Sequence, residues 1–128
     1  MSYHFTKAKS GDFDAVVEEV TEALKTEGFG VLTEIDVKQT LKKKLDIDFP
    51  RYKILGACNP NFAHQALQVE NKIGTMLPCN VIVQEKEGGT VEVSAVNPVE
   101  SMSSVENPEL AKIAGEVKDR LQKIIDDL

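Results

Sequence analysis

The sequence has only two cysteines among its 128 residues and no apolar run long enough to cross a membrane. A membrane-spanning helix needs about 20 apolar residues, so the sequence predicts no membrane partner. Two cysteines do not make a disulfide framework, and we expect both to be reduced thiols. The first residues, MSYHFTKAKSGDFD, lack the apolar core of a signal peptide. We therefore expect a cytoplasmic location.

Positive charge is also scarce. The sequence contains 15 Lys and Arg against 21 Asp and Glu, which gives a formal net charge of −6. Such a surface repels phosphate backbones, so the composition argues against a nucleic-acid partner. The lysines at 42–44 form the only basic run. The sequence also lacks a phosphate-binding loop, a dinucleotide fingerprint, a Ser-His-Asp elbow and a structural zinc pattern. We expect no metal site, and the sequence identifies no cofactor.

The apolar fraction of 41% is enough for one hydrophobic core, and no repeat or linker divides the chain. We therefore expect a single domain over residues 1–128. Apolar spacing and turn residues predict the order β-α-β-(α)-β-α-β-β-α. The expected strands are 3–9, 29–37, 52–58, 79–85 and 91–96. The expected helices begin near residues 13, 37, 60 and 108, the second of them being the least regular.

Two strands allow a finer prediction. A three-residue loop over 87–89 gathers the valines of the final hairpin on one face and leaves Gly89 at the left-handed third position. In the second strand, the alternating residues Val31, Thr33, Ile35 and Val37 are expected to share one side.

These elements predict an α+β fold, in which an antiparallel-rich sheet carries its helices on one face. The apolar stripe covers only part of each helix. The other face of the sheet is therefore expected to be open, and an open face favours a homodimer.

Several blocks of this sequence resemble one family. They are YKILGACNP at 52–60, Ala63-His64, LPCNV at 77–81, GFG at 28–30, and AVNP at 95–98 followed by Met102. Nearly the whole chain is similar to the domain-of-unknown-function family numbered 302. The resemblance implies a fold similar to half of the TATA-binding-protein fold, often dimeric, and it implies no established activity.

Cys58 is the first candidate site residue, because it ends an apolar strand and immediately precedes a predicted helix. The free N–H groups and partial positive charge of a helix N-terminus favour a thiolate. Such a thiol is suited to act as a nucleophile, as a redox group or as a ligand of a soft metal. The alternative is a small buried apolar residue that completes the strand.

Three more residues complete the candidate ligand-binding site of Cys58, Asn59, His64 and Cys79. His64 follows Cys58 on the predicted helix and is a candidate base, although a solvent-facing role is the simpler interpretation. Asn59 is expected to cap the helix and is also placed to bind an anion. Cys79 approaches Cys58 only if their two strands are antiparallel, and the sequence leaves that open.

Three functions remain open. The first is a ligand-binding or sensing module for a small molecule or an anion, with a pocket near Cys58. The second is a thiol-dependent enzyme or redox protein that uses Cys58 with His64. The third is a dimeric structural or interaction protein. The sequence favours the first, because no carboxylate is placed to orient His64 and the cysteines form no Cys-x-x-Cys pair.

Overall fold

The computed structural model describes residues 2–128. In chain order these residues form β1 (His4–Ser10), α1 (Phe13–Thr26), β2 (Gly30–Asp36), α2 (Val37–Leu45), β3 (Tyr52–Cys58), α3 (Pro60–Val69), η1 (Ile73–Met76), β4 (Cys79–Glu85), η2 (Glu87–Gly89), β5 (Thr90–Val96), α4 (Pro98–Ser101) and α5 (Pro108–Asp127). The order confirms the predicted one. It adds the short helix α4 and the two 3-10 turns η1 and η2.

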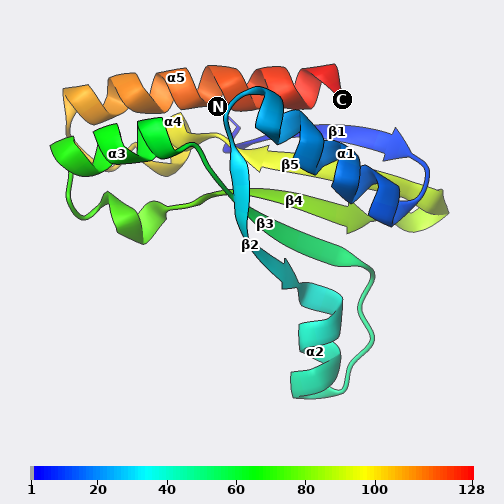
Figure 1. The fold of residues 1–128 in the computed structure, drawn as a ribbon. Coiled ribbons are helices and arrows are strands. Elements are labelled where there is room, and N and C mark those ends of the chain that lie inside the picture. Colours follow the sequence, from blue (N-terminus) through cyan, green and yellow to red (C-terminus); the bar gives the residue numbers. More distant parts are fainter. Residues whose placement is uncertain (1) are drawn as a thin grey trace.

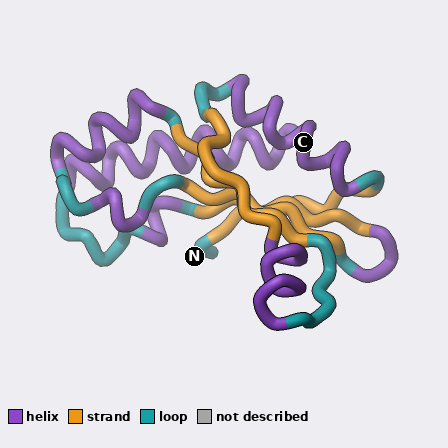
Figure 2. The backbone as a smooth tube through the Cα atoms, turned by 60° about the horizontal axis from the view of Figure 1, so that its bottom comes forward, coloured by secondary structure: helices purple, strands orange, loops and turns teal. Residues whose placement is uncertain are grey.

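The strands make one sheet in the order β1-β5-β4-β3-β2, and each neighbouring pair is antiparallel. Figure 1 shows α1, α3 and α5 together above the sheet, whereas α2 extends below it from β2 and β3. Figure 2 shows the strands as a single twisted layer from a second direction. The predicted α+β class, with an antiparallel sheet and helices on one face, is confirmed.

Three helices begin at the same dipeptide, Asn-Pro. It starts α3 at 59–60, α4 at 97–98 and α5 at 107–108, and in each case the asparagine oxygen accepts a hydrogen bond from a backbone N–H of the first turn. Proline suits this position because its missing N–H would have no partner inside the helix. Local sequence therefore sets where these three helices begin.

The end of α1 directs the next residue into the core. Gly28 adopts a left-handed φ of 83°, and the backbone N–H of Phe29 donates to the carbonyl of Leu24 at 3.0 Å. This arrangement satisfies carbonyls that the helix end leaves free. As a result, Phe29 is buried with 2% of its surface exposed.

The β4–β5 hairpin has the predicted three-residue loop. The backbone N–H of Lys86 donates to the carbonyl of Thr90 at 2.8 Å, and Val83 lies opposite Val93. Gly89 has the expected positive φ of 81°, but Gly88 also has one, of 83°, which the sequence did not predict.

The predicted single-sided alternation of the second strand is wrong. The pairing of β2 with β3 shifts by one residue between Val31 and Thr33, which leaves Leu32 unpaired and exposed. Such a bulge moves later side chains to the opposite face. Val31 packs against the core, while Ile35 is 48% exposed.

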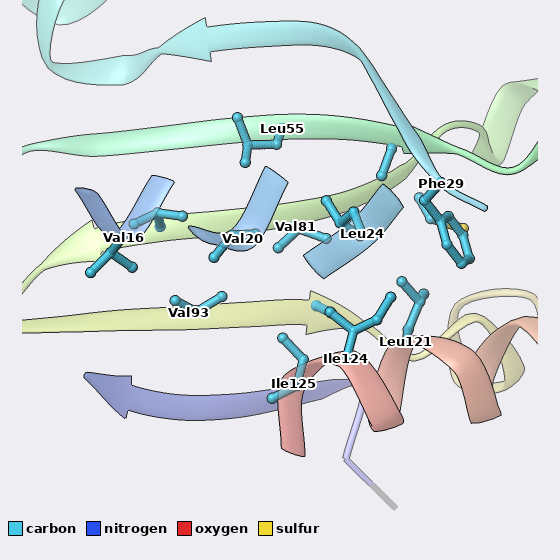
Figure 3. Packing of buried hydrophobic residues seen from close by; sticks show 14 of the residues in the cluster. Val16, Val20, Leu24, Phe29, Leu55, Val81, Val93, Leu121, Ile124 and Ile125 are labelled. Atoms are coloured by element: carbon cyan, nitrogen blue, oxygen red, sulfur yellow. The ribbon is translucent and has the colours of Figure 1, made fainter. Parts of the chain in front are cut away.

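The buried apolar residues form two clusters. The main core fills the space between the sheet, α1 and α5, and Figure 3 shows Val20 and Leu24 beside Val81, with Leu121 next to Ile124. The second cluster is smaller and lies among α3, η1, α4 and the first half of α5. Its buried members are Ala66, Ile73, Met102, Leu110 and Ala114.

Candidate functional site

A cavity of about 40 Å³ lies where the ends of β3 and β4 meet α3, α4 and α5. Its walls come from residues 57–59, residues 77–79, Phe29 and apolar side chains of the three helices. A cavity needs roughly 10–15 Å³ of such volume to hold one water molecule. The space therefore accommodates about three water-sized groups.

The cavity lies at the junction of the two apolar clusters. Phe29 and Val117 line it and belong to the main core, while Met102 and Ala114 line it and belong to the second cluster. The packing between these two clusters is therefore incomplete at this point. A molecule bound here would touch both.

The antiparallel pairing of β3 with β4 answers the question that the sequence left open about the two cysteines. Ala57 lies opposite Cys79, so Cys58 is one residue removed from the partner of Cys79. Both cysteines are free thiols and both line the cavity. Cys79 is buried, whereas Cys58 is partly exposed.

Burial governs the chemistry of Cys79. Burial, with a smaller contribution from the nearby Cys58 thiol, raises the pKa of the Cys79 thiol to about 11. Removing water penalises the charged thiolate more than the neutral thiol. At neutral pH Cys79 is therefore protonated, which makes it a poor nucleophile.

Asn59 joins the ends of two helices. Its side-chain oxygen accepts a hydrogen bond from the backbone N–H of Phe62 at 3.5 Å, and its Nδ2 donates to the carbonyl of Glu27 at 3.2 Å. The N-cap role predicted from sequence is thus present. Both ends of the amide are engaged in holding α3 against the end of α1.

His64 lies on the exposed side of α3. Its Nε2 is 3.4 Å from Nε2 of Gln68 on the next turn, and His64 is not among the residues that line the cavity. The structure therefore brings Cys58, Asn59 and Cys79 together and leaves His64 outside this group.

The candidate site predicted from the sequence, Cys58, Asn59, His64 and Cys79, did not include Met102 or the second cluster. Met102 follows α4, a helix that is absent from the predicted element order, and only 8% of its surface is exposed. A signal was present, because Asn97-Pro98 repeats the dipeptide that opens α3 and α5. The same capping argument would have predicted this short helix.

The cavity carries no charge from the residues described. Its lining includes no Asp, Glu, Lys, Arg or His. Across residues 2–128, no group of three or more His, Cys, Asp or Glu side chains is placed to hold a metal ion. No helix formed by these residues is long and apolar enough to span a membrane.

Comparison with known proteins identifies the family. The sequence model described as "Domain of unknown function DUF302" matches residues 5–128. This chain belongs to the DUF302 family. The resemblance inferred from the Cys-Asn and Asn-Pro blocks is confirmed.

Two proteins similar to this DUF302 domain are one of known structure and one known by its sequence. The crystal structure of an uncharacterized conserved DUF302 protein from Bacillus stearothermophilus superposes with a TM-score of 0.91 at 31% identity, and the match covers 98% of each chain. An uncharacterized protein of Aquifex aeolicus (strain VF5) is 30% identical over 80 residues. That match covers 62% of this chain and 52% of the relative, so it spans about half the length of that curated protein.

Proposed function

We propose that this DUF302 domain is a small ligand-binding or sensing module and that its ligand occupies the cavity beside Cys58. The observation that carries the proposal is the position of the cavity between two apolar clusters. Ligand sites are concave, mostly apolar and largely preformed. This cavity has those properties at the scale of a very small molecule.

Occupancy would change the packing of a defined part of the molecule. An empty apolar volume costs about 24 cal/mol per Å³ in lost contacts, so the volume of about 40 Å³ corresponds to roughly 1 kcal/mol. A ligand that fills it restores contacts between the main core and the cluster around α3 and α4. The physical signal of binding is then a firmer attachment of those helices to the sheet.

The test uses three probes: dimethyl sulfide, acetate and ethylammonium. We expect at least one probe to shift amide NMR signals around the cavity in the parent. The variant Ala114→Leu fills the cavity from α5, because Ala114 is buried and lines it. Ala111→Leu adds the same side chain at an exposed position one turn earlier. Binding should disappear in Ala114→Leu and persist in Ala111→Leu.

Two outcomes would refute this proposal. The first is that no probe perturbs the cavity amides of the parent. The second is that both variants bind equally, which would place binding elsewhere. Denaturation curves establish that each variant is folded at the temperature of the titration.

Two observations favour binding over the thiol-enzyme alternative. His64 does not line the cavity that Cys58 lines, so the intended base is not beside its thiol. Burial keeps Cys79 in the neutral thiol form, because its pKa is raised to about 11. A nucleophilic thiol needs a neighbouring base or a lowered pKa.

A homodimer is a second proposal, carried by the open face of the sheet. Register places Ile35, Ile54 and Ile82 side by side across β2, β3 and β4. The nearby helix α2 has no buried residue, and Leu45 at its end is 63% exposed. A second copy that covers this surface would bury apolar area left uncovered in the single chain.

Sedimentation equilibrium tests the dimer. We expect the parent to dimerise and Ile54→Glu to dissociate it, because a charge would be buried in the interface. Leu67→Glu, at an exposed position on α3, is the control and should leave the dimer intact. A parent that is monomeric at every concentration would overturn this second proposal.

A further inference from the structure

We propose that the ligand of the cavity is a small, neutral, apolar molecule rather than an anion or a cation. This inference rests on the proposed function and names the chemical class of its ligand. The sequence left a small molecule and an anion as alternatives. The structure distinguishes them by the polar groups that the cavity can offer.

The first observation is that the one amide in the lining is already engaged. Asn59 accepts from the Phe62 N–H and donates to the Glu27 carbonyl, so both ends of its side chain have partners. Within residues 2–128, no buried side-chain nitrogen or oxygen lacks a hydrogen-bond partner. One Nδ2 N–H and the weak thiol donors are all that these side chains have left for an anion, which is too little to replace its hydration shell.

The second observation is the absence of a compensating charge among the lining residues described. Moving an unpaired ion from water into an apolar site costs several kcal/mol or more. A basic group does contact the lining from outside it, because the guanidinium of Arg120 lies 5.1 Å from the ring centroid of Phe62. Arg120 shares the carboxylate of Glu27 with Lys123 and its side chain is 46% exposed, so water and Glu27 together screen its charge.

The third observation is that the lining consists mainly of sulfur-containing and alkyl side chains. Three of the residues that line the cavity contain sulfur, namely Cys58, Cys79 and Met102. Sulfur is polarizable and interacts well with apolar and aromatic groups. Together with the alkyl walls, these residues favour a neutral molecule of about three or four non-hydrogen atoms, given the volume of about 40 Å³.

The three probes named above separate the ligand classes, because they are similar in size and differ in charge. Dimethyl sulfide is neutral, acetate is an anion and ethylammonium is a cation. Each is titrated by NMR into the parent and into Ala114→Leu, in a buffer without carboxylates. We expect dimethyl sulfide to bind the cavity at least about tenfold more tightly than either ion, since ion transfer into an apolar site is unfavourable.

The outcomes distinguish this inference from the function on which it rests. Acetate or ethylammonium binding as tightly as dimethyl sulfide, and lost in Ala114→Leu, would overturn the neutral class while leaving a binding module in place. The variant Arg120→Gln identifies acetate that binds at the surface arginine, because such binding would vanish there and persist in Ala114→Leu. If no probe binds the parent, the proposed function fails and the ligand class fails with it.

Discussion

At the scale of single residues, Gly56 shows how closely β2 and the segment that leads into β4 approach the backbone of β3. A Cβ atom at this position would meet Oγ1 of Thr33 and would lie 2.8 Å from Cγ of Pro78. The threonine side chain can rotate, but the proline ring is held by the chain that leads into β4. Gly56 is thus required by close approach, at a strand end that lines the candidate site.

We expect Gly56→Ala to lower the free energy of unfolding by about 1–3 kcal/mol, the usual cost of overpacking. Gly115→Ala is the matched comparison, because Gly115 lies in α5 and a Cβ there meets nothing within 4 Å. That change should raise stability by about 0.5–1 kcal/mol through helix propensity. Urea denaturation measures both, and equal effects of the two substitutions would contradict this account.

Cys79 should make stability depend on alkaline pH. Its pKa is 9.0 in its ordinary state and about 11 in the folded protein, so the folded state binds more protons between these values. Stability is then fully present below about pH 9 and falls as the pH rises toward 11. The loss due to this thiol should be on the order of 2–3 kcal/mol.

The control for this prediction is Cys79→Ala, which removes the thiol and keeps the other groups that titrate at alkaline pH. The difference in unfolding free energy between parent and variant should shrink from pH 8.5 to pH 11. A difference that stays constant over this range would show that the Cys79 thiol does not titrate differently in the two states.

At the scale of elements, α5 connects both apolar clusters. Its buried face includes Leu110 and Ala114 in the second cluster and Leu121 in the main core. The helix therefore holds α3 and α4 to the rest of the molecule as well as covering the sheet.

Leu121→Ala should lower the free energy of unfolding by about 2–5 kcal/mol, because Leu121 has no exposed surface and its truncation leaves a cavity. Leu67→Ala removes the same atoms from a position that is 41% exposed on α3. It should change stability by no more than about 0.5 kcal/mol. Chemical denaturation compares the two, and a loss of similar size in both would be inconsistent with the observed burial.

At the scale of the whole molecule, the division into two clusters predicts unequal local stability. The main core joins the sheet to two long helices, whereas the smaller second cluster joins the first half of α5 to the shorter elements α3, η1 and α4 and borders the cavity. Regions with fewer buried contacts open at lower free energy.

Native-state hydrogen exchange should therefore show amides of α3 and α4 opening at lower free energy than amides of β3, β4 and β5. Ala114→Leu, which fills the cavity, should narrow that difference if the added side chain packs without strain. Identical opening free energies in both regions would mean that the two clusters unfold as one unit.

Much of this protein was determined by its sequence alone. Apolar periodicity predicted the five strands and the long helices, and Asn-Pro pairs marked where α3 and α5 begin. The valine pattern predicted the three-residue hairpin loop. These features depend on residues close together in the chain, whose steric and hydrogen-bonding preferences act locally.

Other features were decided only by tertiary structure. The bulge at Leu32 depends on the partner strand, and the approach of Cys58 to Cys79 depends on their antiparallel pairing. Met102 lines the same cavity and His64 does not, because of the way in which α3 and α4 pack on α5. The physical reason is that a site made from segments far apart in sequence is set by strand direction and helix packing, which no local pattern of residues encodes.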